Sequence, residues 1–275
     1  MHYRDLIVTA IAFGSLPYIL RRPHIGILVF AWLSYMNPHR LCWGFAYDFP
    51  FALIVAVTTL VSLLISKEPK RFPLTGLTLI WLLLLAWYTC TTVFAAFPEH
   101  AWPKYERVLK IHVMTMASVM LITSKDRIHQ LLWVILLSIG FYGFKGGIFT
   151  ISTGGSFRVW GPPGSDIEDN NHLAIALLMM CPLAYYLRSI STQIWLRRGL
   201  LISMGLFVVS AIGSQSRGAL LASLSFGGYL WTKSKGKIVS AILIIVAGVL
   251  IFNFMPLSWH ERMGTIKTYQ QDGSA

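Results

Sequence analysis

The feature that most constrains this chain is a series of long apolar runs that recurs along its whole length. Several runs reach the length that an α-helix needs to cross a membrane core of roughly 30 Å at about 1.5 Å per residue, whereas others are shorter than about 17 residues, and the second run along the chain could be re-entrant. Lipid offers backbone amides no hydrogen-bond partner, so segments that cross it must be helical. Ten runs qualify as spans: Asp5–Leu20, His24–Met36, Pro50–Ser66, Leu74–Phe97, Val108–Thr123, Ile128–Phe144, His172–Leu187, Leu200–Gly213, Ala219–Trp231 and Ile238–Met255.

Composition argues against a water-soluble fold. Only 12% of the 275 residues are charged and 55% are hydrophobic, whereas soluble domains carry about 25% charged residues. The runs are spread over the chain, so a cleaved signal peptide on a soluble body does not explain them. We therefore expect an all-α fold, a polytopic membrane helical bundle of about ten transmembrane helices that forms one integral-membrane domain over residues 1–275.

The excess of basic residues indicates topology rather than a nucleic-acid partner. The net charge is +12, but the Lys and Arg residues form short clusters between apolar runs, and no nucleic-acid-binding motif accompanies them. Basic loops stay on the cytoplasmic side of a membrane. Every cluster follows an odd-numbered span, which predicts that both termini are periplasmic. The clusters are Arg21 and Arg22; Lys67, Lys70 and Arg71; Lys125 and Arg127; Arg188, Arg197 and Arg198; and Lys233, Lys235 and Lys237.

The sequence shows no sign of a cofactor. It contains no nucleotide-binding glycine loop and no Ser-His-Asp signature. Its three cysteines, Cys42, Cys90 and Cys181, are single and widely spaced, which suggests neither a zinc site nor a disulfide framework. We expect no metal and no other cofactor, and membrane lipids as partners.

The longest loop on the predicted periplasmic side runs from Lys145 to Asn171, and its Gly and Pro pairs predict turns. Arg158 lies beside Trp160 within it, a pairing suited to binding a phosphate and stacking on a sugar. Lys145, Asn170 and Asn171 are further candidates for substrate binding. The structural alternative is that Asp169 or Asn170 is the N-cap of the next helix.

Arg217 stands in the segment Gly213-Ser-Gln-Ser-Arg-Gly218, between two apolar runs on the same predicted side. An arginine at the centre of a membrane helix costs roughly 2.5–3.5 kcal/mol, so such a residue usually faces a polar cavity or an anion. The flanking glycines would let a ligand approach the backbone, and Ser216 is a second candidate. The alternative is that Arg217 extends its side chain to the interface.

The segment Phe97–Lys110 combines Trp102 and Tyr105 with three cations near helical spacing. This pattern predicts an interfacial helix that precedes the Val108–Thr123 span. Aromatic and basic residues at this depth usually anchor a membrane protein, although Lys104 and Arg107 could face a lipid-linked anion. His112 lies inside a span, and such a histidine is more often packed than catalytic.

Several long motifs together resemble one known family. They are MNPHRLCWGFAYDFPFALIVA from Met36, KEPKRFPLT from Lys67, RVLKIHVMT from Arg107, GFYGFKGGIFTISTGGSFRVWGPPGSDIEDNNHLAIALLM from Gly140, GSQSRGALLA from Gly213 and MPLSWHERMGTIKTYQQDGSA from Met255. With these motifs the chain resembles the O-antigen ligase and polymerase superfamily, and within it the O-glycosylation ligases associated with exosortase A systems.

The resemblance implies a multi-pass glycosyltransferase of the bacterial inner membrane with its active face in the periplasm. Such an enzyme transfers a glycan from undecaprenyl pyrophosphate to an acceptor hydroxyl, here on a protein, without a metal. The arginine of the family's Ser-Arg-Gly motif, held to bind the pyrophosphate, corresponds to Arg217. The family's second functional arginine and catalytic histidine lie in a later periplasmic loop. Residues 1–140 would then be an N-terminal helical region, and 141–275 an incomplete, C-terminally truncated ligase-like core.

Three alternatives remain open at this point. A repeat-unit polysaccharide polymerase would share the architecture and the donor but use a second lipid-linked glycan as acceptor. A lipid-linked glycan transporter would need charged residues inside several spans, and such residues are scarce here. A non-catalytic glycan-binding membrane protein is the third, whereas an enzyme would also have an acceptor protein or lipid as partner.

Overall fold

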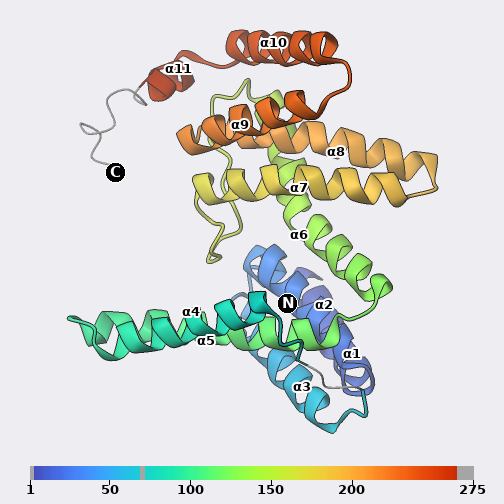
Figure 1. Ribbon diagram of the computed structural model, residues 1–275, viewed down its shortest axis with the longest axis vertical. Coiled ribbons are helices and arrows are strands. Elements are labelled where there is room, and N and C mark those ends of the chain that lie inside the picture. The colour runs from blue at the N-terminus through green and yellow to red at the C-terminus, as the bar shows by residue number, and fades with distance from the viewer. Residues whose placement is uncertain (1–2, 69–71, 265–275) are drawn as a thin grey trace. The chain divides into compact units, whose positions relative to one another are not determined.

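The computed structural model describes residues 3–68 and 72–264, and every regular element within these ranges is a helix (Figure 1). The chain divides into two compact units. The first comprises Met1–Ser34 and Cys42–Leu131, and the second comprises Tyr35–Leu41 and Leu132–Ala275. Each of the ten predicted spans corresponds to one helix of the structure, from α1 to α10, although the spans predicted for α3, α4, α5 and α10 extend past the ends of those helices.

The first unit is built on the packing of α1 (Tyr3–Arg21), most of α2 (Pro23–Met36) and α3 (Phe51–Ile65), and it includes the short 3₁₀ helix η2 (Phe45–Tyr47). The other 3₁₀ helix, η1 (Pro38–Leu41), belongs to the second unit. The larger apolar core of the first unit joins residues such as Val8, Leu33 and Val55 from the three α-helices. A side chain at Gly26 would collide with Thr59, so the glycine lets α2 and α3 approach closely. Burial of these apolar surfaces stabilises the packing.

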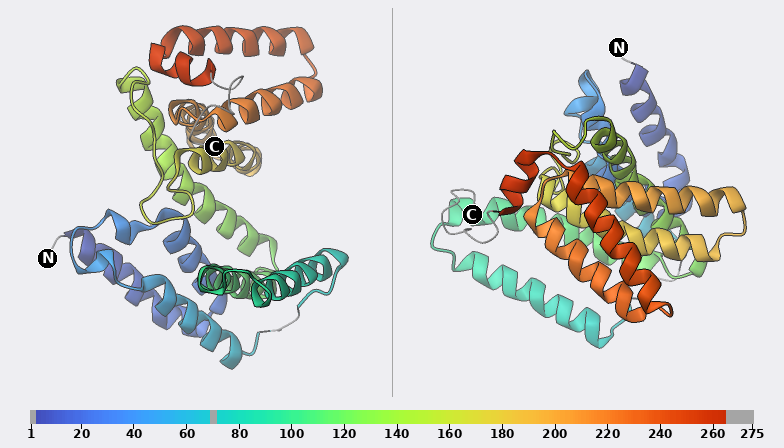
Figure 2. Two further views of the ribbon diagram at one scale, coloured as in Figure 1. Left: turned by 90° about the vertical axis from the view of Figure 1, so that its left-hand side faces the viewer. Right: turned by 90° about the horizontal axis from the view of Figure 1, so that it is seen from above.

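The remaining helices of the first unit are α4 (Gly76–Val93) and α5 (Pro98–Leu121), which lie side by side (Figures 1 and 2). Thr75 and Thr78 form a capping box at the start of α4. The predicted interfacial helix and the span after it are one continuous helix of 24 residues, so the expected boundary between them was wrong. Pro98 occupies a first-turn position of α5, where proline is well tolerated.

Helix α6 (Lys125–Ser152) begins in the first unit and continues in the second from Leu132 onward. The second unit also contains α7 (Asn170–Ile190), α8 (Ile194–Gly213), α9 (Arg217–Lys233), α10 (Lys237–Phe254) and the short α11 (Leu257–Gly264). α7 packs along α8, and the core includes Leu173, Leu177 and Phe207. Tyr142 of α6 donates a hydrogen bond of 2.7 Å to the carbonyl of Met36.

Two glycines near the end of α6 face α8, although the sequence prediction assigned them to a loop. The predicted loop 145–171 begins only at residue 153, because α6 continues to Ser152. A Cβ at Gly147 would lie 2.6 Å from the Leu206 carbonyl oxygen, and one at Gly146 would meet the Ser210 hydroxyl. Small residues allow membrane helices to pack at short range, so this glycine pair serves helix packing instead of a turn.

Five helices of the described residues have the length and composition of a membrane span, namely α4, α6, α7, α8 and α10. The most apolar stretch of α10 has none of its residues buried within the structure, and that of α4 has 11% buried. Helices that are apolar on all sides and yet uncovered by protein require a lipid environment. The chain is therefore a helical membrane protein, as the sequence predicts.

Candidate functional site

The α8–α9 connection, Ser214–Ser216, is a very short polar segment between two apolar helices. All three residues are buried, with at most 5% of their surface exposed. The Ser216 hydroxyl is the N-cap of α9 and accepts a hydrogen bond of 3.1 Å from the Ala219 amide. The turn is closed by Gln215, which has a φ of 56° and whose amide donates to the carbonyl of Ile212.

Gln215 joins three segments that are distant in sequence. Its side-chain Nε2 donates to the Gly155 carbonyl at 3.1 Å, and its Oε1 accepts from Arg158 Nε at 3.4 Å. Its backbone carbonyl accepts from Arg262 Nε at 2.8 Å. A left-handed backbone at a residue other than glycine costs about 1–3 kcal/mol and persists where surrounding contacts enforce it, often at functional sites. The contacts of Gln215 meet that condition.

The start of α7 is attached to the same connection. Asn170 is buried, and its Nδ2 donates to the Ser214 carbonyl at 2.7 Å. Asp169 is the N-cap of α7 and accepts from the Asn171 amide at 2.8 Å, so the capping alternative is confirmed for Asp169. Partial burial acts to raise the pKa of the Asp169 carboxyl, but hydrogen bonds from Asn171 and His172 outweigh it and lower the pKa. The side-chain amide of Asn170 thus holds the α8–α9 connection in position.

The loop 153–169 has a defined shape because close backbone contacts hold its two sides together. The Gly161 amide donates to the Glu168 carbonyl at 2.9 Å, and a side chain at Gly161 would collide with the Ile167 carbonyl. Gly164 has a φ of +70°, and its amide donates to Glu168 Oε2 at 2.7 Å. The loop also joins the end of α8, since the Val159 amide donates to the Gly213 carbonyl.

Three arginines from three elements meet at the α8–α9 connection. Arg158 belongs to the loop, Arg217 is the first residue of α9, and Arg262 lies in α11. Arg217 and Arg262 are half-buried and Arg158 is exposed. The terminal Nη groups of Arg158 make no hydrogen bond within the described residues. Amides at a helix N-terminus also attract anions, so the arrangement suits a phosphate-bearing ligand.

Sequence reasoning missed Arg262 as a member of this site. α11 reaches the connection because Met255, Trp259 and Met263 pack against Ile212 and Leu220, which flank it. The spacing of Trp259 and Met263, four residues apart, is the signal that could have predicted a packed helix here. Within that helix, Arg262 neighbours a packed residue and is directed to the connection.

The structure does not join the other predicted residues of the second unit to the α8–α9 connection by any side-chain bond within the described residues. Trp160 is 54% exposed, and Asn171 is also exposed. Lys145 is exposed within α6, about two turns before the end of that helix. In the described part of the chain, no hydrogen bond joins any of these three side chains to the connection.

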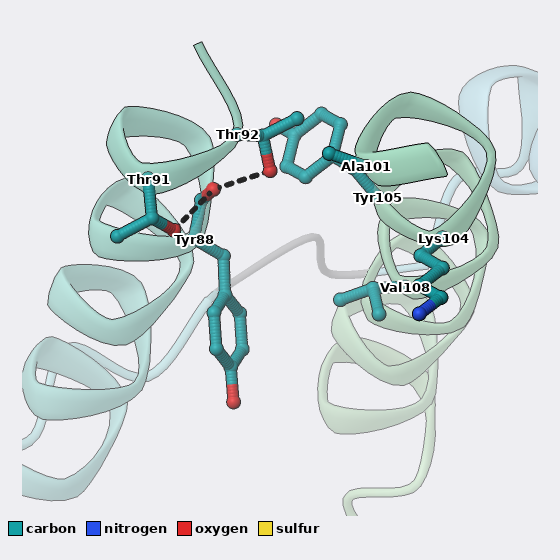
Figure 3. Close-up of a pocket in the computed structure, with 7 residues that line it drawn as sticks. All are labelled: Tyr88, Thr91, Thr92, Ala101, Lys104, Tyr105 and Val108. Atoms are coloured by element: carbon teal, nitrogen blue, oxygen red, sulfur yellow. Dashed lines mark hydrogen bonds between the residues drawn. The ribbon is translucent and has the colours of Figure 1, made fainter. Parts of the chain in front are cut away.

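Lys104 and Arg107 lie on α5 in the first unit. Lys104 lines a hollow of about 270 Å³ between α4 and α5, shown in Figure 3. The anchoring interpretation of this segment fits the contacts of its aromatic residues: Trp102 packs edge-on against Tyr105, and the Tyr105 hydroxyl hydrogen-bonds Thr89 at 2.7 Å. His112 is packed, as predicted, because its ring stacks on Trp81 and its Nδ1 bonds the Val108 carbonyl.

These observations define the class of the protein, a helical membrane protein with a polar, arginine-lined connection between apolar helices. Residues 3–192 match a family described as a family of unknown function, DUF5935, and the chain belongs to that family. The matched residues include Arg158 and end before α8, so Arg217 and Arg262 lie outside them. No curated protein and no solved structure matches the chain.

Proposed function

We propose that the protein is a glycosyltransferase of the O-antigen ligase type, acting at the periplasmic face of a bacterial inner membrane. Its donor would be a glycan on undecaprenyl pyrophosphate, and its acceptor a hydroxyl group on a protein. The observation that carries this proposal is the meeting of Arg158, Arg217 and Arg262 at one buried, strained connection. Guanidinium groups bind phosphate oxygens through paired hydrogen bonds.

The reaction would use these cations to stabilise a leaving group. The acceptor oxygen attacks the anomeric carbon of the donor sugar while the bond from that carbon to the pyrophosphate oxygen breaks. Negative charge then develops on the pyrophosphate, where Arg217, the N-terminus of α9 and the Nη groups of Arg158 can stabilise it. The acceptor proton passes to a general base, which is not assigned to a residue of this chain. No nucleotide or metal enters this scheme.

The remaining predicted residues have positioning or recognition roles in the proposal. Ser216 and Asn170 hold the connection in shape. The exposed ring of Trp160 could stack on a sugar, and Asn171 could bond its hydroxyls. Lys145 would add positive charge on the same face, and Lys104 and Arg107 would contact lipid phosphates.

The proposal includes ten spans with periplasmic termini, and contacts within each unit support that topology. In the first unit, three predicted cytoplasmic loops lie at one end. Arg127 forms a bidentate ion pair with Glu68, with N–O distances of 2.8 and 3.0 Å. The Ser62 hydroxyl donates a hydrogen bond to the Ile19 carbonyl, near Arg21. In the second unit, Gly155 contacts both Gln215 and Met255, so predicted periplasmic segments also meet.

Labelling of single cysteines tests the topology. Ser156→Cys, in the exposed part of loop 153–169, and Lys235→Cys, between α9 and α10, would each be made after replacement of the three native cysteines. A membrane-impermeant maleimide applied to intact cells should label only the first. Labelling of only the second would reverse the orientation and remove the periplasmic site.

An assay of glycan transfer in membranes that contain the whole protein tests the activity. Arg217→Ala should abolish transfer from an undecaprenyl-pyrophosphate glycan while leaving the amount of membrane-inserted protein unchanged. Arg198→Ala, which removes a cation at the opposite end of α8, is the matched control and should retain transfer. Full activity of Arg217→Ala would remove Arg217 from the mechanism. Donor binding without transfer by the wild-type protein would favour the glycan-binding alternative.

A further inference from the structure

The hollow between α4 and α5 has a composition that suits a ligand of its own. Its wall comes entirely from the last turns of α4 and the first turns of α5 in the first unit (Figure 3). The lining residues are Tyr88, Thr91, Thr92, Ala101, Lys104, Tyr105 and Val108. Most of the surface that lines the α4–α5 hollow is apolar, and Lys104 is the one charged residue among those that line it.

The surroundings of the α4–α5 hollow place it at the depth of a membrane interface. α4 has the length of a span, and almost none of its surface is covered by the rest of the structure. The turn that follows α4 carries Phe94 and Phe97, which are 82% and 71% exposed, and Trp102 on α5 is 50% exposed. Exposed aromatic residues at the end of a span are typical of the boundary between hydrocarbon and water.

Among the polar groups of the hollow, the hydroxyls of Thr91, Thr92 and Tyr105 are hydrogen-bonded within the protein, whereas the Tyr88 hydroxyl and the ammonium group of Lys104 have no hydrogen bond within the described residues. The Thr91 and Thr92 hydroxyls donate to the Tyr88 carbonyl at 3.1 and 2.8 Å, and Tyr105 is bonded to Thr89. Lys104 has no hydrogen bond or ion pair within the described residues. Lys110, on the same helix, differs because it pairs with Glu106 at 2.6 Å.

We propose that the α4–α5 hollow binds an anionic membrane phospholipid, with its phosphate on Lys104 and one acyl chain along Val108 and Ala101. A soluble anion would gain nothing from the apolar walls, and an uncharged amphiphile would leave the Lys104 charge without a partner. Because little of α4 is covered by the rest of the structure, a lipid would reach the hollow directly from a surrounding bilayer, without a route through water. Lys104 contacts a lipid phosphate in both proposals, but binding of a phospholipid here requires no glycan transfer, so each proposal can fail without the other.

Native mass spectrometry of the whole purified protein tests the site. The protein in detergent would be mixed with phosphatidylglycerol or with phosphatidylcholine of the same acyl chains, and retained lipid counted. Lys104→Ala should lower phosphatidylglycerol retention about fivefold, the effect of one cation near an anionic lipid surface, and leave phosphatidylcholine unchanged. Lys110→Ala is the matched control and should retain lipid as the wild type does.

Two further measurements keep the test decisive. Ala101→Phe, which fills the hollow without changing charge, should remove retention of both lipids; gel filtration checks that the variant is folded. Equal phosphatidylglycerol retention by Lys104→Ala and the wild type would overturn the proposal, as would an equal loss in Lys110→Ala, which would indicate surface charge alone. Preferential displacement of the phospholipid by undecaprenyl phosphate would also overturn it and assign the hollow to the donor.

Discussion

The α8–α9 connection and the α4–α5 hollow both place basic side chains beside apolar helices, but they do so in opposite ways. At the connection, contacts from a loop, from the start of α7 and from α11 hold three buried residues in one geometry. In the hollow, Lys104 has no protein partner within the described residues. A constrained site suits a reaction that needs fixed charges, whereas an open groove suits a lipid that exchanges with the membrane.

Helices α6 and α8 of the second unit are also closely constrained, and a glycine substitution between them should have the largest expected effect on stability. Gly147→Ala places a Cβ 2.6 Å from the Leu206 carbonyl oxygen, which α6 and α8 can avoid only by moving apart. We expect a loss of about 3 kcal/mol in stability, at the upper end of overpacking effects, and reduced glycan transfer. Thermal unfolding in detergent, monitored by circular dichroism, measures the first quantity.

Gly205→Ala, on α8, is the control for that substitution. A Cβ at Gly205 meets nothing within 4 Å, so this variant should be at least as stable as the wild type, because alanine favours a helix more than glycine does. Equal stability of the two variants would show that α6 and α8 are not held at short range. The contrast between the constrained α8–α9 connection and the open α4–α5 hollow would then lose its support from helix packing.

Arg262→Ala probes the contact that closes the connection from α11. Its loss leaves the carbonyl of Gln215 without its charged donor, and hydrogen bonds to charged groups contribute about 1.5–3 kcal/mol. We expect transfer to fall about tenfold or more, with a smaller fall for Arg262→Lys. Glu261→Ala, at the exposed neighbouring residue, should have wild-type activity. Wild-type rates for Arg262→Ala would limit α11 to a packing role.

The sequence predicts α1 to α10, because each contains a local apolar run, but it does not predict α11, which lacks such a run. It also predicts an N-cap at Asp169 or Asn170, since a polar residue directly before an apolar run is a local signal, and the structure shows that Asp169 is the cap. It could not predict that Gly146 and Gly147 serve packing, because a glycine pair looks the same in a turn and in a close helix contact. Nor could it predict the contact of Arg262 with Gln215, which spans 47 positions and depends on how α11 packs.

The two asparagines at the start of α7 differ in their contacts, because Asn170 is buried and bonds the α8–α9 connection, whereas Asn171 is exposed. Asn170→Ala leaves the Ser214 carbonyl buried without its donor, which typically costs about 1–3 kcal/mol. We therefore expect about 2 kcal/mol lower stability in thermal unfolding. Asn171→Ala, at the exposed neighbour, should differ from the wild type by less than about 0.5 kcal/mol. Equal effects of the two would contradict the attachment of α7 to the connection.

The smallest expected effect concerns the ion pair of Glu68 and Arg127 in the first unit. The hydrogen bonds from Arg127 are the main reason why the pKa of the Glu68 carboxyl lies below its usual value. A lowered pKa means that the pair stabilises the fold above the usual carboxyl pKa, and that this contribution disappears as the pH falls through the lowered value.

Glu68→Gln should therefore lower stability near neutral pH by less than about 1 kcal/mol, since both side chains are partly exposed. The difference from the wild type should vanish in acid, as thermal unfolding across pH would show. Asp126→Asn, which removes a neighbouring carboxylate that is not part of this ion pair, is the control. A difference that persisted in acid would mean that Glu68 acts through packing. The two loops it joins would then give less support to their assignment to one side of the membrane.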